Sequence, residues 1–243
     1  MSNQFSFKQI IDMVSAVRLM RFRDNLNPRE AWLLFCVTHA ARSHAQLFQD
    51  LWVLHETGEQ RNGFFVEFGA ANGVRYSNTL LLEQDYGWTG LLAEPARSWY
   101  PAIRENRTAT VDERCVWSRS GETVEFVEQA NALHSGMQGY SIVDNDATTR
   151  TYAVQTVSLN DLLTQHGAPR RIDFLSLDTE GSELEILEAF DFDHWDVRLI
   201  AVEHNHLPAR AQLYKLLTAK GYVRKLETLS DVDDFYVKAE PAA

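Results

Sequence analysis

Two carboxylates flank a glycine-bearing turn in the stretch 64-FFVEFGAANGVRYSNTLLLEQDYGWTGLLAEP-95. Glu67 closes a short apolar run just before the turn, and Glu94 closes the next one. Gly69 and Gly73 allow backbone conformations, or a close approach of a ligand, that a side chain would prevent. The spacing G-x-x-x-G differs from the dinucleotide fingerprint G-x-G-x-x-G. Because Glu67 would also repel a pyrophosphate, the pattern disfavours a nicotinamide-dependent oxidoreductase and favours a cationic ligand.

The position of Glu94 matches the acid that accepts hydrogen bonds from ribose hydroxyls in dinucleotide-binding folds. An adenosine ribose together with a positively charged, amino-acid-like tail describes S-adenosylmethionine, which is therefore our hypothesis for the ligand. Each acid also has a structural alternative. Backbone N–H groups could satisfy Glu67, and Glu94 could serve a helix start beside Pro95.

Polar residues also end two later apolar runs. Asp178 follows 172-IDFLSL-177, while Glu203 and His204 follow 197-VRLIAV-202. Neighbouring central strands would bring these side chains together in one acidic cleft. Two chemistries fit: His204 or Asp178 acts as general base for an acceptor hydroxyl, or the carboxylates hold Mg²⁺ or Mn²⁺ with His204 or Asn205. A hydrogen-bonded network that only holds the two loops together is the structural alternative.

The elements that must position these residues alternate along the chain. Strands are predicted from the unbroken apolar runs at 64–68, 89–94, 172–177 and 197–203. Helices are predicted at 77–86, 97–105, 159–166, 182–190 and 208–220. The alternation indicates an α/β fold with a mainly parallel sheet and helices on both faces. Residues 221–237 predict an antiparallel hairpin at one edge, and the polar stretch 128–151 predicts a lid or substrate-binding loop.

The beginning of the chain predicts two helices. Residues 5–22 have amphipathic spacing, and residues 29–55 are expected to form one helix between Asn27-Pro28 and Gly58. We expect residues 1–60 to be a helical extension docked on one α/β domain of residues 61–243. A spare apolar face within residues 1–40 predicts an interface between two copies of the chain.

Composition narrows the classes of partner. The chain has 243 residues, 45% of them apolar, and a formal charge of −11, which disfavours nucleic acid and anionic membranes as partners. The apolar run 31–37 is too short for a membrane span. Cys36 and Cys115 are far apart and in no ligand-like spacing. They predict buried, inert thiols and a cytoplasmic, reducing environment.

These motifs together resemble the FkbM-type family of S-adenosylmethionine-dependent methyltransferases. Residues 64–95 look like its opening segment, 172-IDFLSLDTEGSELEILEAFDF-192 like its second signature, and 197-VRLIAVEHN-205 like its next strand. The resemblance covers about residues 43–238. This sequence departs from the family at Ala70-Ala71, where the family often has Ala-Asn or Ala-Asp.

The resemblance implies a class I methyltransferase Rossmann-like fold, with seven strands that are parallel except for the last hairpin. It implies methyl transfer from S-adenosylmethionine to a hydroxyl of a small polar acceptor, such as a sugar of a glycan or natural product. By position, the cofactor contacts are Glu67, Gly69 and Asn72 at the methionine end, Ser77 and Asn78 at the carboxylate, Glu94 at the ribose, Ser118 beside the adenine, and Asp178. An inactive scaffold protein with this fold is the alternative. The motifs leave open the acceptor, transfer to oxygen or nitrogen, metal dependence and oligomeric state.

Overall fold

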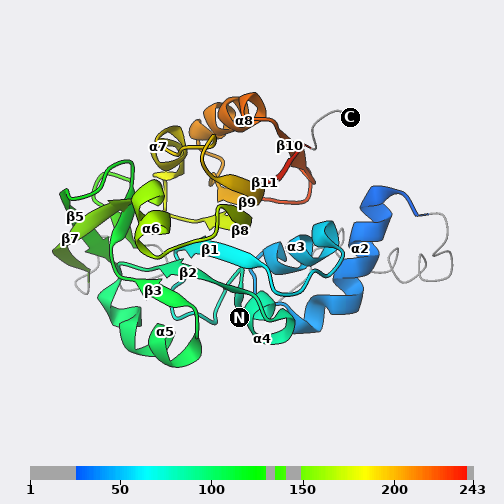
Figure 1. The fold of residues 1–243 in the computed structure, drawn as a ribbon, viewed down its shortest axis with the longest axis horizontal. Coiled ribbons are helices and arrows are strands. Elements are labelled where there is room, and N and C mark those ends of the chain that lie inside the picture. Colours follow the sequence, from blue (N-terminus) through cyan, green and yellow to red (C-terminus); the bar gives the residue numbers. More distant parts are fainter. Residues whose placement is uncertain (1–25, 130–134, 141–148, 240–243) are drawn as a thin grey trace.

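The computed structural model describes residues 26–129, 135–140 and 149–239. Its centre is a seven-stranded sheet with the strand order β10-β11-β9-β8-β1-β2-β3 (Figure 1). The middle of the sheet consists of β1 (Phe64–Phe68), β2 (Thr89–Ala93), β8 (Arg171–Leu177) and β9 (Asp196–Glu203), which run parallel. These are the four predicted apolar runs, and the parallel pairing confirms the predicted fold class.

The closing hairpin is also confirmed. β10 (Tyr222–Lys225) and β11 (Asp233–Lys238) are antiparallel, and β11 lies between β10 and β9. Because β11 runs opposite to β9, its first residue lies at the same edge as the last residue of β9. Asp233 is thereby the register partner of Glu203. At the other edge of the sheet, β3 (Thr110–Asp112) pairs with β2.

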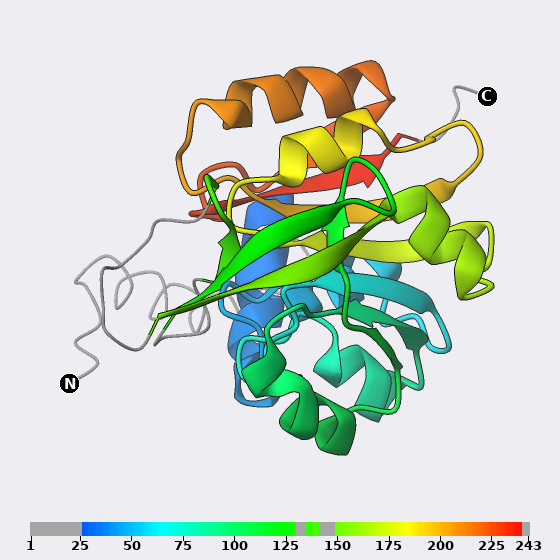
Figure 2. The same cartoon turned by 90° about the vertical axis from the view of Figure 1, so that its left-hand side faces the viewer.

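Helices cover both faces of the sheet (Figures 1 and 2). On one face lie α6 (Leu159–Gln165), α7 (Glu183–Glu188) and α8 (Ala209–Ala219), which share a core with Val66, Leu175 and Ile200. On the other lie α2 (Pro28–His39), α3 (Gln49–Thr57), α4 (Leu80–Tyr86) and α5 (Tyr100–Asn106), the last preceded by the 3-10 turn η3 (Arg97–Trp99). Both layers exclude water from the sheet, which explains why its strands read as continuous apolar runs.

The expectation of one helix over residues 29–55 was wrong, because α2 continues only into the 3-10 turn η2 (Ala40–Arg42) and α3 then starts afresh. The buried Asp50 carboxylate accepts hydrogen bonds from Ser43 Oγ at 2.6 Å and His44 N at 3.0 Å, which holds the chain in a turn. Phe48 has a left-handed backbone (φ 61°), which a helix does not accommodate. The predicted start at Asn27 and end at Gly58 are confirmed. The helix expected at 5–22 lies outside the described residues.

A second sheet was not foreseen. It consists of β4 (Cys115–Trp117), β5 (Thr123–Glu128), β6 (Gly136–Met137) and β7 (Arg150–Ser158), in the order β4-β7-β5-β6. Figure 2 shows β5 and β7, in green, as a long ribbon outside the main sheet. β3 and β4 follow one another closely in the sequence but belong to different sheets. Of the expected loop 128–151, residues 130–134 and 141–148 lie outside the described residues.

Cys36 and Cys115 are free and buried, as predicted. None of the helices in residues 26–129, 135–140 and 149–239 has the length and apolar character that crossing a bilayer requires.

Candidate active site

A cleft of about 430 Å³ opens at the carboxyl ends of the central strands. Its floor is built from the residues that follow each strand: Gly69 and Ala71 after β1, Glu94 after β2, Asp178, Thr179 and Glu180 after β8, and Glu203 and Asn205 at the end of β9. The second sheet supplies a wall with Cys115, Val116, Phe126 and Met137. Ligands of open parallel sheets bind at this edge, so this cleft is the candidate active site.

Gly69 lets two strand ends meet beneath the cleft. Its backbone is left-handed (φ +74°), and a Cβ at this position would collide with the carbonyl oxygen of Asp178. Any side chain would push β1 and β8 apart at their carboxyl ends. The fold therefore requires glycine at position 69, and this residue also lines the cleft.

Glu94 ties the glycine turn to the second strand. Its Oε2 accepts a hydrogen bond from Ala71 N at 2.7 Å, and its Oε1 accepts one from Ala96 N at 2.8 Å. Burial raises the pKa of this carboxyl to about 7, although both hydrogen bonds act in the opposite direction. Each oxygen retains a lone pair, and Glu94 lines the cleft. The carboxylate can therefore accept hydrogen bonds from a ligand.

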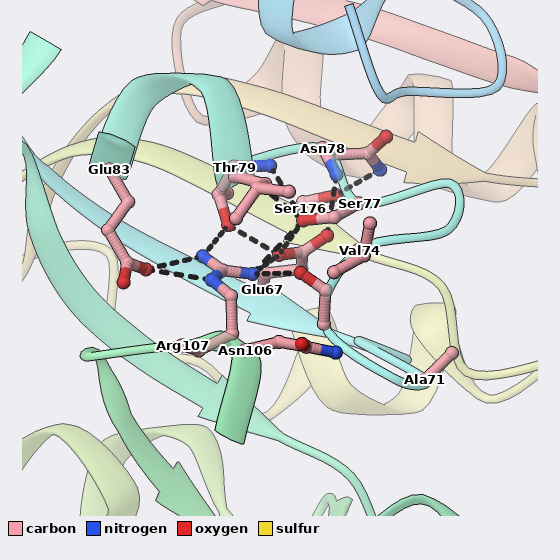
Figure 3. A network of polar contacts seen from close by, with 12 residues as sticks. Glu67, Ala71, Val74, Ser77, Asn78, Thr79, Glu83, Asn106, Arg107 and Ser176 are labelled. Atoms are coloured by element: carbon pink, nitrogen blue, oxygen red, sulfur yellow. Dashed lines mark hydrogen bonds and ion pairs between the residues drawn. The ribbon is translucent and has the colours of Figure 1, made fainter. Parts of the chain in front are cut away.

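Glu67 lies in a closed polar network beside the cleft rather than in its lining (Figure 3). The residue is 2% exposed. Its carboxylate accepts hydrogen bonds from Asn78 N at 2.6 Å, Ser77 Oγ at 3.1 Å and Thr79 Oγ1. The structure thus places Glu67 beneath the turn, where it holds the start of α4.

Arg107 is the cation of this network, and sequence analysis missed it. Its side chain is fully buried and contacts Glu83 at 2.8 Å and Glu67 at 3.5 Å. It also donates to Thr79 Oγ1 at 2.8 Å and to the carbonyl oxygen of Gly73 at 3.3 Å (Figure 3). A lone arginine forty positions after Glu67 carries no signal in the sequence. Only the packing of α5 against the turn reveals the pair.

The N–H groups at the start of α4 already have partners. Ser77 N donates to the carbonyl oxygen of Val74, and Asn78 N donates to Glu67. Thr79 N and Leu80 N both donate to Ser77 Oγ. Ser77 and Asn78 were expected to hold the cofactor carboxylate, but these backbone donors are not available for it.

The side chain of Asn78 presents an acceptor. Asn78 Nδ2 donates to Ser176 Oγ at 2.8 Å. Its Oδ1 is buried and finds no hydrogen-bond partner among the described residues, and the residue lines the cleft. A buried acceptor without a partner is costly unless a ligand supplies a donor.

Asn72 and Ser118 do not line the cleft. The Asn72 side chain accepts hydrogen bonds from Val74 N at 3.0 Å and Arg75 N at 2.8 Å, so it fixes the shape of the turn. Ser118 is partly buried just beyond β4, and it is Cys115 and Val116 of that strand that contribute to the wall.

Carboxylates at the ends of two neighbouring strands, β8 and β9, meet in the cleft. Leu177 pairs with Val202, so Asp178 and Glu203 follow on adjacent strands. One oxygen each from Asp178, Glu180 and Glu203 lies within 4.8 Å of the others. Glu203 Oε2 is buried and has no hydrogen-bond partner in the part of the chain that the structure describes. The predicted meeting of Asp178 and Glu203 is what the strand register produces.

This crowding changes the proton affinity of the group. Burial is the main cause that raises the pKa of Glu203 to about 8, and Glu180 and Glu183 add to it. Burial, followed by the charge of Glu203, raises the pKa of Asp178. Protons or a cation must therefore relieve the repulsion at neutral pH.

Asp233 and Gln49 also lie beside these acids, and sequence analysis assigned neither of them to the site. Gln49 Nε2 donates to Asp233 Oδ2 at 2.7 Å, and both residues line the cleft. Burial raises the pKa of Asp233 to about 7. A signal was available: the first residue of an antiparallel last strand must lie at the carboxyl edge of its neighbours.

His204 does not reach the cleft. Its side chain is fully buried, Nδ1 accepts from His206 N at 3.0 Å, and Nε2 lies 3.7 Å from Asp234 Oδ1. Burial lowers its pKa. Of the three predicted catalytic residues, only Asp178 and Glu203 line the cleft.

Comparison with known proteins identifies the family of the chain. The family profile of the methyltransferase FkbM domain matches residues 67–234, more than half of the chain. The chain belongs to the FkbM methyltransferase family.

Individual similar proteins share low sequence identity with this chain or match only a short part of it. Methyltransferase sdnD of Sordaria araneosa is 36% identical over 78 residues, which are 28% of this chain and span 30% of that protein. The solved structure of methyltransferase FkbM from Methylobacillus flagellatus KT is 14% identical with a TM-score of 0.47, covering 95% of this chain and 59% of that one. Precorrin-6y C5,15-methyltransferase from Geobacter metallireducens GS-15 is 14% identical with a TM-score of 0.43, covering 77% of this chain and 85% of that one.

Proposed function

We propose that this chain transfers a methyl group from S-adenosylmethionine to a hydroxyl of a small polar acceptor, such as a sugar of a glycan or natural product. One observation carries the proposal. Glu94 and the paired carboxylates of Asp178 and Glu203 line the same cleft at the carboxyl edge of the sheet. That arrangement combines a ribose-binding acid with proton acceptors deep in one site.

The lining residues suit the cofactor. Gly69 leaves room for close approach, Glu94 offers oxygens to the ribose hydroxyls, and Asn78 Oδ1 is an acceptor that lacks a donor. The acidic floor favours a cation. When bound there, S-adenosylmethionine would supply a methyl group on a positively charged sulfur. Its amine could donate a hydrogen bond to Asn78 Oδ1.

Asp178 and Glu203 can accept the proton of the acceptor hydroxyl. Transfer to a hydroxyl would form an oxygen–methyl bond as the methyl–sulfur bond of the bound cofactor breaks, with that electron pair left on sulfur, so this chain would have to take up the hydroxyl proton. A carboxylate of Glu203 or Asp178 takes it. With its pKa near 8, Glu203 is a stronger base than an ordinary carboxylate. A nearby positive charge favours its ionised form, so a bound cation and the base act together.

A metal-assisted route would use the same side chains, since Mg²⁺ prefers oxygen ligands. We assign proton transfer to the carboxylates themselves, because both line the cleft and the pKa of Glu203, raised to about 8, makes it a stronger base than an ordinary carboxylate. Activity measured after dialysis against EDTA distinguishes the two routes. Full activity without added metal supports the carboxylate base, and loss that Mg²⁺ restores would replace it with the ion.

The test of the proposal is calorimetric titration of S-adenosylmethionine and S-adenosylhomocysteine into the unmodified protein and Glu94→Gln. We expect binding that weakens about tenfold or more in the variant, because hydrogen bonds to a charged acceptor are lost. Glu125→Gln is the matched control, an exposed acid of β5 outside the cleft. Absence of binding to the unmodified protein would refute the cofactor assignment. Binding without transfer to any hydroxyl acceptor would favour an inactive scaffold.

A further inference from the structure

The amino-acid tail of S-adenosylmethionine carries a carboxylate beside two positive charges, the sulfonium and the amine. If the proposed function holds, this chain must bind that carboxylate. Five acids line the cleft: Glu94, Asp178, Glu180, Glu203 and Asp233. Their field suits the sulfonium and the amine but opposes a carboxylate. A ligand with this tail therefore needs a compensating cation or a set of free N–H donors.

The obvious donors are already in use. The backbone N–H groups of Ser77 and Asn78 donate to Val74 and Glu67, and the Asn78 amide nitrogen donates to Ser176. The Asn78 atom that remains without a hydrogen-bond partner among the described residues is the acceptor Oδ1. These groups match the amine of the tail, but they cannot bind its carboxylate.

Arg75 is the cation that the cleft does offer. Among the described residues that line the cleft, it alone carries a positive charge. Its side chain is exposed, and it forms no ion pair within residues 26–129, 135–140 and 149–239. Its guanidinium lies 4.8 Å from the ring centroid of Tyr76, and Nη2 is 3.4 Å from the Tyr76 hydroxyl. Most of its N–H donors therefore remain free for a planar anion.

The backbone holds Arg75 and Tyr76 at the mouth of the cleft. Asn72 Oδ1 accepts from Arg75 N at 2.8 Å, and Tyr76 forms a bridge with Ala45. Tyr76 has a left-handed backbone (φ 59°) and remains 45% exposed. A strained, exposed tyrosine is unfavourable for stability alone, and such strain concentrates at functional sites. The turn thus places Arg75 and Tyr76 where they can contact a ligand in the cleft.

We infer that Arg75, oriented by Tyr76, binds the carboxylate of the cofactor's amino-acid tail, while Asn78 Oδ1 accepts a hydrogen bond from the amine of the same tail. An arginine fork can engage both oxygens of a carboxylate at once. The carboxylate and the amine of the tail would then each be bound by one residue of the same turn, Arg75 and Asn78, three positions apart.

The test compares two ligands that differ only in this carboxylate. S-adenosylhomocysteine and its decarboxylated analogue, which keeps the amine, are titrated calorimetrically into the unmodified protein, Arg75→Gln and the control Arg29→Gln, an exposed arginine of α2 outside the cleft. We expect Arg75→Gln to weaken S-adenosylhomocysteine about tenfold to a hundredfold. The same change should leave the affinity for the decarboxylated ligand unaltered. Arg29→Gln should alter neither, and all three proteins should melt at the same temperature.

Three results would overturn the inference. Equal weakening of both ligands would mean that Arg75 only shapes the turn. No weakening of either ligand, with a raised KM for a carboxylate-bearing acceptor, would move the contact from the cofactor to the acceptor. Failure of the unmodified protein to bind S-adenosylhomocysteine would instead refute the proposed function, and this assignment with it.

Discussion

Two groups of buried carboxylates lie at the carboxyl edge of this sheet, and they are satisfied in opposite ways. Glu67 and Glu83 share the fully buried Arg107 and a set of hydroxyl and backbone donors. Asp178 and Glu203 lie beside further acids, and Glu203 Oε2 has no hydrogen-bond partner among the described residues. The same chemical group thus serves as internal support in one place and remains available for protons or a ligand in the other.

The comparison shows why acids of equal prominence in the sequence differ in role. A carboxylate with a buried cation and several donors gains stability from its ionised form. One that is surrounded by other carboxylates is destabilised by ionisation, and it gains when a cation or a proton arrives. The first arrangement holds the loop that shapes the cleft, and the second is the one to which we assign proton transfer.

The largest expected effect comes from removing the support. Arg107→Met should lower the free energy of unfolding by about 3–5 kcal/mol, because Glu67 and Glu83 would remain buried without a partner. Denaturant titration measures it. Arg104→Met, on the exposed side of α5, is the matched control and should cost little. Equal losses in the two variants would contradict the distinction between the two groups.

Removing an acid from the other group should affect catalysis instead. Glu203→Gln is expected to lower kcat by about 10²–10⁴, the usual contribution of a general base. Its melting temperature should stay the same or rise, because the repulsion within the cluster decreases. The measurement is steady-state kinetics beside thermal melting, with Glu125→Gln as control. A variant that keeps full kcat would remove Glu203 from the proposed mechanism.

The pH dependence of protein stability tests the acidic cluster around Glu203. Glu203 has its pKa raised from 4.5 to about 8, so the folded protein holds its proton more tightly than the unfolded chain does. Its contribution to stability is therefore fully present below about pH 4.5 and is lost as the pH rises through about 8. Denaturation between pH 5 and pH 8 should show a decline that is smaller in Glu203→Gln. An equal decline in both proteins would contradict this assignment.

The smallest effect on kcat is expected at His204. Its ring lies outside the cleft, so His204→Gln should change kcat by less than about tenfold, whereas loss of a general base would cost 10²–10⁴. Kinetics as a function of pH provide the check. A larger loss, together with the disappearance of an ionisation near neutral pH, would restore histidine as the base.

The sequence was most informative where structure depends on near neighbours. The apolar runs beginning at Phe64, Thr89, Ile172 and Val197 are strands, and the hairpin at the end of the chain forms as predicted. It failed at η2 and Phe48, where a contact with Asp50 replaces the helical pattern. It also missed the second sheet, because β5 and β7 are half exposed and their alternation is weak.

By itself, the sequence determined the four central strands and the closing hairpin, the glycine that two strand ends require, and the acids that end the strands. Those features depend on the spacing of residues within one element. Only the tertiary structure decided that Glu67 faces Arg107, that Asp233 faces Gln49, and that His204 lies away from the cleft. The reason is physical: the partner of a charge is set by which elements pack together, and that choice is made by the whole core rather than by any local pattern.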